Sequence, residues 1–431
     1  GGMATLWAND FFLYGEDNCT PVDILESTIA IIRADDPDYD HTSFPAGSPQ
    51  SIVVTCNDQG TSVPVEVWLI DAAGNADFCI AYVNVPDNIL SCLTAGMATV
   101  AGALATENAQ GVEDALVELA TLSPAGQMGL LTQQSDDAGL FQFPNAVPLS
   151  GSYTLTPTKD DNPLNGVTTY DLVLISKHIL GLEPLATPYK MIAADANRSG
   201  SITTFDIVEF RKLILGIYNE LPNNTSWRFV DKAYIFPEPA NPFQTTFPEN
   251  ISAQNVQADR LTEDFVGVKV GDVNNTVIAN SLLFVEDRTA ATMLFDVEDR
   301  AVKAGEVFTV DFNGAERVQG YQFTMNFDGL EVLNIAPGTD MRPDNFAVFA
   351  NAITTSVDGT ANEFAITFRA AKDGQISQML GVSSRITKAE GYSLTNDRLD
   401  IAFRFSSPEA PEGVTIIKGV GFELYQNQPN P

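Results

Sequence analysis

Asp160-Asp-Asn-Pro-Leu-Asn-Gly-Val-Thr-Thr-Tyr-Asp171 and Asp195-Ala-Asn-Arg-Ser-Gly-Ser-Ile-Thr-Thr-Phe-Asp206 are two versions of one twelve-residue loop. Each loop leads into an apolar stretch that ends in Leu-Gly, at Gly181 and at Gly216. The first residues, the last residues and the terminal glycines of the two copies are all 35 positions apart. A constant offset over a loop and the stretch that follows it indicates a structural repeat.

The second loop has the ligand pattern of a calcium site. Side-chain oxygens lie at positions 1, 3, 5 and 12, a glycine at position 6 permits the sharp turn, and position 7 offers its carbonyl. Position 9 can act directly or through a water molecule. The candidate ligands are Asp195, Asn197, Ser199, Ser201, Thr203 and Asp206.

The first loop matches the same pattern less completely. Its position 5 is Leu164, which has no side-chain oxygen, and its position 6 is Asn165, which adopts a left-handed turn less readily than glycine. The candidate positions are Asp160, Asn162, Leu164, Gly166, Thr168 and Asp171. We expect one or two bound Ca²⁺ ions in total. The alternative for both loops is a pair of polar turns that cap helices.

One helix is predicted after each loop, ending at the glycine, which is a favoured residue just past a helix end. A loop–helix, linker, loop–helix unit over residues 159–220 resembles a dockerin. That resemblance implies a cohesin-like partner, contacted through a helix face that includes loop positions 10 and 11. The candidate partner-binding residues are Thr169, Tyr170, Thr204, Phe205, Lys177, Arg211 and Lys212. The two aromatic residues depart from the small hydroxyl residues of many dockerins, and core packing is their alternative role.

Composition restricts the classes of function. The formal net charge of −33 argues against nucleic acid and anionic membrane surfaces as partners. The 431 residues suffice for three to five domains, and no apolar run of 18 residues predicts a membrane span. The charge suits an extracellular, cation-rich setting. Because Gly-Gly is not a natural start, we expect a mature or excised portion of a longer chain.

All four cysteines lie near the start of the chain, at Cys19, Cys56, Cys79 and Cys92. An even number in one small β-domain predicts two disulfides and an oxidising location, with the connectivity open. The alternative, a zinc site of four thiolates, lacks any CxxC pair. The turn Asp71–Asn75 between two strands, the second carrying a cysteine, resembles the last hairpin of hyalin-repeat and related immunoglobulin-like surface modules. We assign residues 1–93 to such a module.

Short alternating strands continue through residues 94–158 and predict a small β-sandwich. The order of its segments resembles carboxypeptidase-regulatory-like domains, which are stalk modules. Residues 221–279 are rich in proline and aromatic residues, and proline spacing forbids a long helix there. We expect an irregular segment that covers the dockerin-like unit and contains one closing strand.

Residues 280–419 predict a further β-sandwich of jelly-roll type. The segments Val302–Phe312 and Val318–Ile335 resemble the opening of a cohesin domain, while an unrelated β-sandwich is the alternative. The ending Leu424-Tyr-Gln-Asn-Gln-Pro-Asn-Pro431, within residues 420–431, resembles the start of the sorting domain of type IX secretion substrates in Bacteroidota. That resemblance implies export and an extracellular or outer-surface location.

The predicted fold class is therefore mainly β and multidomain, with tandem β-sandwiches and one small helical calcium-binding unit. No catalytic motif occurs, and the only histidines are His41 and His178, so we expect no enzyme activity. We expect a secreted structural or adhesive protein that partners with other copies of itself or another surface protein. Docking of the helical unit of one copy on the sandwich of the next would build filaments. Packing of the two modules within one chain is the competing possibility, and the non-catalytic tail of a secreted hydrolase is the alternative function.

Overall fold

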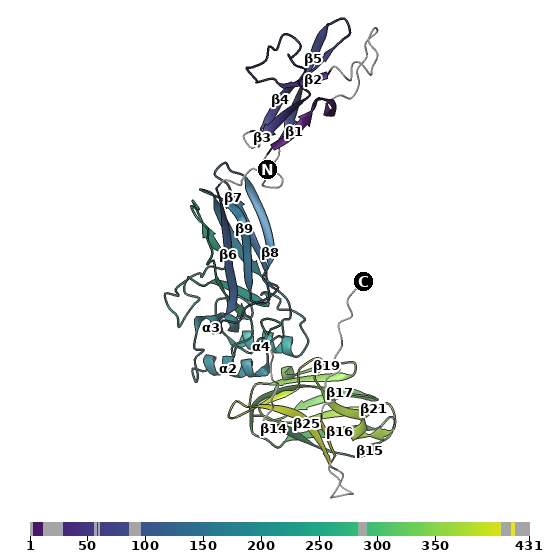
Figure 1. The fold of residues 1–431 in the computed structure, drawn as a ribbon. Coiled ribbons are helices and arrows are strands. Elements are labelled where there is room, and N and C mark those ends of the chain that lie inside the picture. The colour runs from purple at the N-terminus through teal and green to yellow at the C-terminus, as the bar shows by residue number, and fades with distance from the viewer. Residues whose placement is uncertain are drawn as a thin grey trace.

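The computed structural model describes residues 3–11, 29–55, 58, 61–85, 96–282, 291–406 and 415–418. Strands make up most of the regular structure, so the predicted mainly β fold class is confirmed. Figure 1 shows the β-units in chain order, with the helices α2, α3 and α4 gathered between the second and third units. None of the helices in the described ranges has the length and apolar character needed to cross a lipid bilayer.

The N-terminal unit contains a three-stranded sheet in the order β2-β4-β5 and a two-stranded sheet of β1 and β3. Its core is formed by apolar residues of β2 and β4, such as Ile29, Ile31 and Val65. Cys79 is exposed on β5, and the other three cysteines lie outside the described residues. The bounds are β1 Met3–Trp7, η1 Ala8–Asp10, β2 Ile29–Arg33, β3 Ser51–Thr55, β4 Ser62–Ile70 and β5 Ala76–Asn84.

The second unit is one β-sandwich built from two separate stretches of chain. Its sheets have the orders β12-β10-β7-β8 and β11-β13-β6-β9. The segment 221–279, for which one strand was expected, supplies three strands that complete both sheets. We call residues 96–158 and 221–282 the first sandwich. Its strands are β6 Met97–Thr106, β7 Leu116–Leu122, β8 Met128–Gln134, β9 Leu140–Pro148, β10 Ser152–Thr158, β11 Trp227–Asp231, β12 Ile251–Ala253 and β13 Phe265–Lys269.

The helical unit, residues 159–220, is inserted between β10 and β11 of this sandwich. Its helices are α2 Thr169–Ile179, α3 Pro188–Ala194 and α4 Thr204–Ile214. The short helix α3 was not expected, and it leads directly into the second loop. Phe236 and Phe247 of the 221–279 segment pack into the core of the helical unit, so the two cores are joined by one continuous stretch of chain.

The helices begin and end where the repeat predicts. Thr168 and Thr203 are the N-caps of α2 and α4, and each hydroxyl accepts a hydrogen bond from a backbone N–H of the first turn. At the other end, Gly181 and Gly216 have φ of +69° and +75°, the left-handed conformation that glycine adopts at low cost. The two copies therefore share one local structure around their helices.

The third unit, which we call the second sandwich, comprises residues 291–406 and 415–418. Its strands follow the order β18-β21-β16-β14-β25-β24-β17-β20-β19, with β23 beside β17 and β26 beside β25. Phenylalanine side chains dominate its core, including Phe295, Phe312 and Phe323. The bounds are β14 Ala291–Glu298, β15 Ala301–Val302, β16 Val307–Gly314, β17 Val318–Phe327, β18 Leu330–Pro337, η3 Pro343–Asn345, β19 Phe346–Phe349, β20 Ala352–Val357, β21 Glu363–Ala370, β22 Gly374–Gln375, α5 Ile376–Met379, β23 Leu380–Ser383, β24 Glu390–Ser393, β25 Arg398–Ser406 and β26 Thr415–Lys418.

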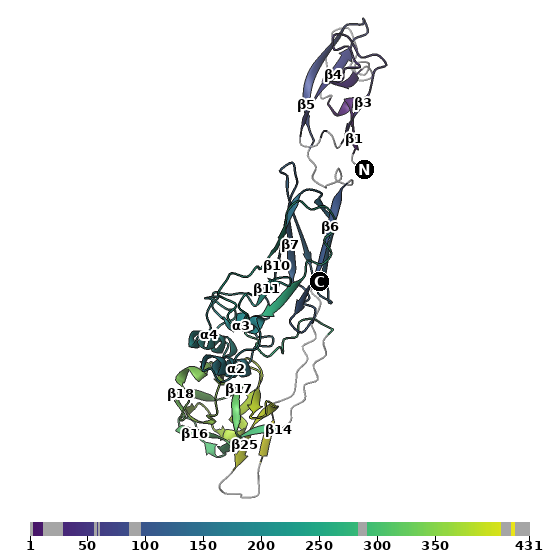
Figure 2. The same cartoon turned by 90° about the vertical axis from the view of Figure 1, so that its left-hand side faces the viewer.

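The helical unit lies directly against the second sandwich. Figures 1 and 2 show α2 and α4 between the first sandwich and strand β17, from two perpendicular directions. The predicted segment 420–431 lies outside the described residues.

Candidate functional site

The second loop wraps around its own first carboxylate. Asp195 Oδ1 accepts a hydrogen bond from Ser199 N at 2.9 Å, and Oδ2 accepts one from Gly200 N at 2.8 Å. Gly200 has a φ of +76°, which allows the chain to turn at position 6. At the end of the loop, Asp206 accepts hydrogen bonds from Ala196 N at 3.0 Å and Thr203 N at 2.8 Å. Both carboxylates are therefore fixed on the same turn.

These two carboxylates fit a cation. Asp195 is 1% exposed and Asp206 is 0% exposed, and all the hydrogen bonds found to them in the described part of the chain come from neutral groups. Burial raises the pKa of Asp206, and the negative charge of Asp195 adds to that effect. Two buried like charges are costly unless a positive charge compensates them. A bound cation would supply that charge.

The remaining donors of the second loop suit calcium better than a transition metal. The described residues contain no cluster of three or more His, Cys, Asp or Glu side chains arranged for a metal. The loop would instead complete its ligand set with the oxygens of Asn197, Ser199 and Ser201, and such neutral oxygens are typical calcium ligands. Thr203 Oγ1 is already engaged with Asp206 Oδ2 at 3.1 Å, so water is the better ligand at position 9.

The first loop is arranged differently. Asp160 and Asn162 are exposed, and Asp160 Oδ1 accepts a hydrogen bond from Ser226 N at 2.7 Å, outside the loop. Asp171 is 0% exposed and accepts hydrogen bonds from Thr168 N at 2.9 Å and from Val273 N at 2.9 Å. The first carboxylate of this loop therefore accepts a hydrogen bond from outside the loop, whereas Asp195 accepts hydrogen bonds from its own loop.

A lysine and a further aspartate from the first sandwich lie against the first loop. Lys269, at the end of β13, is 3% exposed and donates a hydrogen bond to Pro163 O at 2.8 Å. Burial lowers the pKa of Lys269 to about 8, and the carboxylates of Asp272 and Asp171 oppose that shift. Burial and the charge of Asp272 raise the pKa of Asp171 well above its usual range. The buried ammonium is therefore bound to the backbone of the first loop and interacts electrostatically with two buried carboxylates.

The start of α2 is hydrogen-bonded to the second sandwich. Thr169 N donates to Gln322 Oε1 on β17 at 2.6 Å, and the hydroxyls of Thr169 and Ser356 are 2.7 Å apart. All three residues are buried. Next along the helix, Tyr170 packs on Tyr392 with 5.1 Å between ring centroids. Loop positions 10 and 11 of the first copy therefore contact the second sandwich of the same chain.

The end of α4 is capped by the second sandwich. Thr354 Oγ1 donates to Leu215 O at 2.7 Å, and Thr387 Oγ1 donates to Ile214 O at 2.6 Å. The last carbonyls of a helix have no partner within the helix, so hydroxyls from another unit satisfy groups that would otherwise need water. Both threonines are buried.

Arg211 is the buried cation of this contact. Its side chain is 1% exposed, and it donates to Asp358 Oδ1 at 2.5 Å and to Asp344 Oδ2 at 3.2 Å. Ser176 Oγ, the equivalent position in the first repeat, donates to Asp358 Oδ2 at 3.3 Å. Asp358 therefore receives hydrogen bonds from both helices. We call the whole contact between the helical unit and the second sandwich the joint.

Four other predicted partner-binding residues do not contribute hydrogen bonds or ion pairs to the joint. Thr204 and Phe205 are exposed, and Phe205 retains 54% of its accessible surface. Lys177 Nζ forms an ion pair with Glu183 at 3.3 Å, and Lys212 Nζ donates to Tyr218 Oη at 3.1 Å, both within the helical unit. Only the first repeat presents positions 10 and 11 to the second sandwich, and a partner-binding role for Thr204 and Phe205 stays a prediction.

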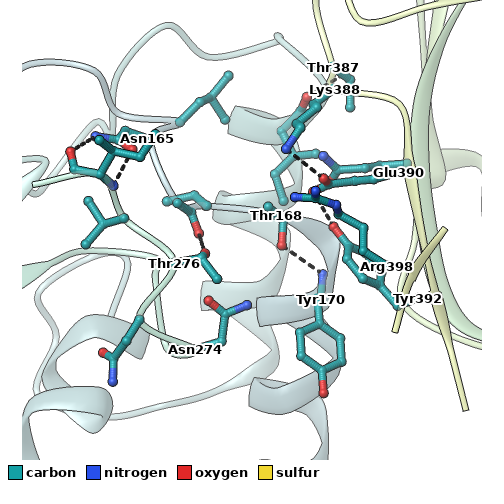
Figure 3. A pocket seen from close by; sticks show the side chains of 18 of the residues that line it. Asn165, Thr168, Tyr170, Asn274, Thr276, Thr387, Lys388, Glu390, Tyr392 and Arg398 are labelled. Atoms are coloured by element: carbon teal, nitrogen blue, oxygen red, sulfur yellow. Dashed lines mark hydrogen bonds and ion pairs between the residues drawn. The ribbon is translucent and has the colours of Figure 1, made fainter. Parts of the chain in front are cut away.

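A pocket of about 820 Å³ opens beside the joint. Figure 3 shows residues of the first loop on one wall and residues near β24 on the other. Glu390 is 3% exposed, and its carboxylate accepts hydrogen bonds from Tyr392 Oη at 2.5 Å and Lys388 Nζ at 3.1 Å. Because the protein already satisfies this buried charge, we treat the pocket as part of the joint.

Sequence reasoning missed the residues that complete these sites. They are Lys269, Asp272, Gln322, Asp344, Thr354, Ser356, Asp358 and Thr387. None belongs to a local motif, because each acts on a segment 100 or more residues away. Among these residues, Lys269 has a signal in the sequence, because a lysine at the end of an otherwise apolar strand indicates a buried charge.

Comparisons with known proteins give structural neighbours only. No protein-family model matches the chain, and no curated protein matches it. A cohesin from the archaeon Archaeoglobus fulgidus is 15% identical, covers 30% of this chain and 91% of its own, and has a TM-score of 0.19. A chain of a cohesin–dockerin complex from Clostridium thermocellum is 12% identical, covers 32% and 100% respectively, and has a TM-score of 0.21. The major pilin subunit of Bacillus cereus is 8% identical, covers 70% and 68%, and has a TM-score of 0.18.

The neighbours are therefore cohesin modules and a pilin. All three TM-scores lie below 0.5, so these likenesses carry no argument about function. The dockerin likeness, calcium binding, the disulfides and type IX secretion stay predictions. The functional proposal rests on contacts within this chain.

Proposed function

We propose that this chain is a structural protein of the cell surface, in which a calcium-organised helical unit locks two β-sandwiches into one block. The observation that carries the proposal is the joint. Arg211 is buried between Asp344 and Asp358, and three further hydrogen bonds bury hydroxyls of both partners. Paired polar groups of this kind are typical of a specific interface, although Arg211 Nε has no hydrogen-bond partner among the described residues.

Because the joint forms within one chain, the hypothesis that copies assemble into filaments through this face has to be revised. The same residues cannot hold the next copy while they hold their own second sandwich. In the proposed function the helical unit is a rigid connection between the two sandwiches. This connection stiffens a long chain of modules. Assembly through this face would require the joint to open and re-form between copies.

A cysteine pair across the joint tests the proposal. Thr169→Cys with Ser356→Cys places thiols where two hydroxyls are 2.7 Å apart. We expect oxidation of this double variant to give a monomer that runs differently on a non-reducing gel, because the contact lies within one chain. The measurement is the gel, with peptide mass spectrometry to identify the new disulfide.

The two single variants are the matched control for this test. They carry the same native cysteines, and when mixed they can form the new disulfide only between copies. We expect no cross-linked dimer in the mixture. A dimer of Thr169→Cys with Ser356→Cys, or a ladder of larger species in the double variant, would show that copies are joined and would overturn the proposal.

Calcium acts in this proposal by ordering the second loop. Without an ion the buried carboxylates Asp195 and Asp206 repel each other, so binding energy becomes folding energy. We expect Asp195→Ala with Asp206→Ala to lower the melting temperature in calcium to near the value in chelator. At a calcium concentration of 100 times the Kd the loss would be roughly 2 to 3 kcal/mol, or about 5–10 °C. An unchanged melting temperature in calcium would contradict the role.

A further inference from the structure

The two loops differ in backbone at matched positions. In the second loop the left-handed residues are Arg198 and Gly200, at positions 4 and 6. In the first loop they are Asn162 and Gly166, at positions 3 and 7. A calcium loop needs its sharp turn at position 6 so that the oxygens at positions 1, 3 and 5 converge. The first loop has its left-handed residues elsewhere and lacks the turn at position 6.

The first carboxylate shows the consequence of this difference. Asp195 receives two backbone N–H groups from positions 5 and 6 of its own loop. The equivalent Asp160 accepts a hydrogen bond from Ser226 N instead, and the N–H at position 6, that of Asn165, donates to Asn162 O at 2.9 Å. The first loop therefore does not close around its own first residue.

A buried ammonium is hydrogen-bonded to the backbone of this loop. Lys269 Nζ donates to Pro163 O at 2.8 Å and to Val270 O at 3.2 Å, and its side chain is 3% exposed. Asp171 and Asp272 are both buried and interact electrostatically with this ammonium. Pro163 is position 4 of the loop, so the ammonium adds a buried positive charge beside the loop without contacting a ligand position.

The neighbouring turn closes the loop from outside. Asp272 Oδ2 accepts a hydrogen bond from Val277 N at 2.8 Å, and Thr276 Oγ1 donates to Gly166 O at 3.2 Å. Gly166 O is the position 7 carbonyl, a ligand in a calcium loop. The amide of Asn165 bonds the backbone of Ile278 through both its oxygen and its nitrogen, at 3.0 and 2.8 Å. The loop is thus held by protein groups on the side that faces the first sandwich.

We infer that the first loop binds no calcium because protein groups, the buried ammonium of Lys269 among them, already hold it, so that calcium binding in this repeat is confined to the second loop. The ion-dependent half of the unit then carries α4 and Arg211, whereas the half that carries α2 stays fixed to the first sandwich with or without calcium. The residues of the second loop still fit a calcium ion under this inference.

The 35-residue repeat supplies a matched pair of variants for the test. Asp160→Asn and Asp195→Asn make the same change at position 1 of each loop, and asparagine keeps the size of the side chain and one acceptor oxygen. Calcium bound to the full-length chain would be counted by calorimetry and native mass spectrometry. We expect Asp195→Asn to lose one ion relative to the parent chain and Asp160→Asn to lose none. Loss of an ion in Asp160→Asn, or no loss in Asp195→Asn, would overturn the inference.

Hydrogen exchange on the unmodified chain gives a second measurement, which does not depend on whether a variant folds. Peptides that cover residues 196–206 should exchange several-fold more slowly in calcium than in chelator. Peptides that cover residues 161–171 should change much less, because their partners are already in place. Equal slowing of both loops would also overturn the inference.

Discussion

Replacing Arg211 by alanine is expected to lower the free energy of unfolding by about 3 kcal/mol. The guanidinium is 1% exposed and pairs with two carboxylates, so its loss leaves a cavity and an uncompensated negative charge at Asp358, whose side chain is only 15% exposed. Asp344 is 46% exposed, so water can hydrate its carboxylate in the variant. The expected loss of unfolding free energy is therefore at the low end of the range for a broken buried ion pair. Calorimetry of the full chain should show the second sandwich unfolding separately from the first.

An exposed ion pair on the same sandwich provides the control. Arg369 pairs with Glu331 at 2.8 Å, and the two side chains are 49% and 59% exposed. Arg369→Ala should change the free energy of unfolding by less than about 1 kcal/mol, because water replaces a solvated pair. If Arg211→Ala and Arg369→Ala had equal effects, the joint would not depend on the buried cation.

A double-mutant cycle with Asp358 separates the ion pair from simple loss of packing. If Arg211 and Asp358 act as a unit, Arg211→Ala with Asp358→Ala should cost little more than Arg211→Ala alone. Strict additivity of the two single effects would contradict the pairing. The radius of gyration from solution scattering should rise in Arg211→Ala, since the joint is the contact that is weakened.

The local parts of this structure followed from the sequence. Thr168 with Asp171, and Thr203 with Asp206, are close in the chain, and each pair sets a helix start through hydrogen bonds within four residues. Alternating apolar residues likewise predicted strands such as β17 and β21. Patterns of this kind are sufficient because the physical causes lie within a few residues.

The long-range parts could not be predicted in the same way. Arg211 is 133 and 147 residues from its two carboxylate partners, and no periodicity relates them. The division of the first sandwich between two stretches of chain could not be predicted for the same reason. Strand β13 pairs with β6 as a parallel strand, and the two lie more than 150 residues apart in the sequence. Lys269 lies in the segment for which one closing strand is predicted, and only the fold brings its ammonium to the first loop.

The two helix-terminal glycines allow the joint to be tested by a matched pair of substitutions. Gly181 and Gly216 occupy equivalent positions with φ of +69° and +75°, so alanine is strained to the same extent at both, by about 1 kcal/mol. At Gly181 a new Cβ would meet nothing within 4 Å. Gly181→Ala should therefore show the backbone strain alone.

At Gly216 the same methyl group would lie inside the joint. Its Cβ would be 2.5 Å from Ile386 Cγ2 and 3.7 Å from the ring of Phe349, both on the second sandwich. Because Cγ2 branches directly from Cβ, relief requires the whole Ile386 side chain to rotate or the units to separate, at an additional cost of about 1–3 kcal/mol. We expect Gly216→Ala to lose about 2–4 kcal/mol in total, measured by urea unfolding beside Gly181→Ala. Equal losses in the two variants would mean that the end of α4 does not rest on the second sandwich in solution.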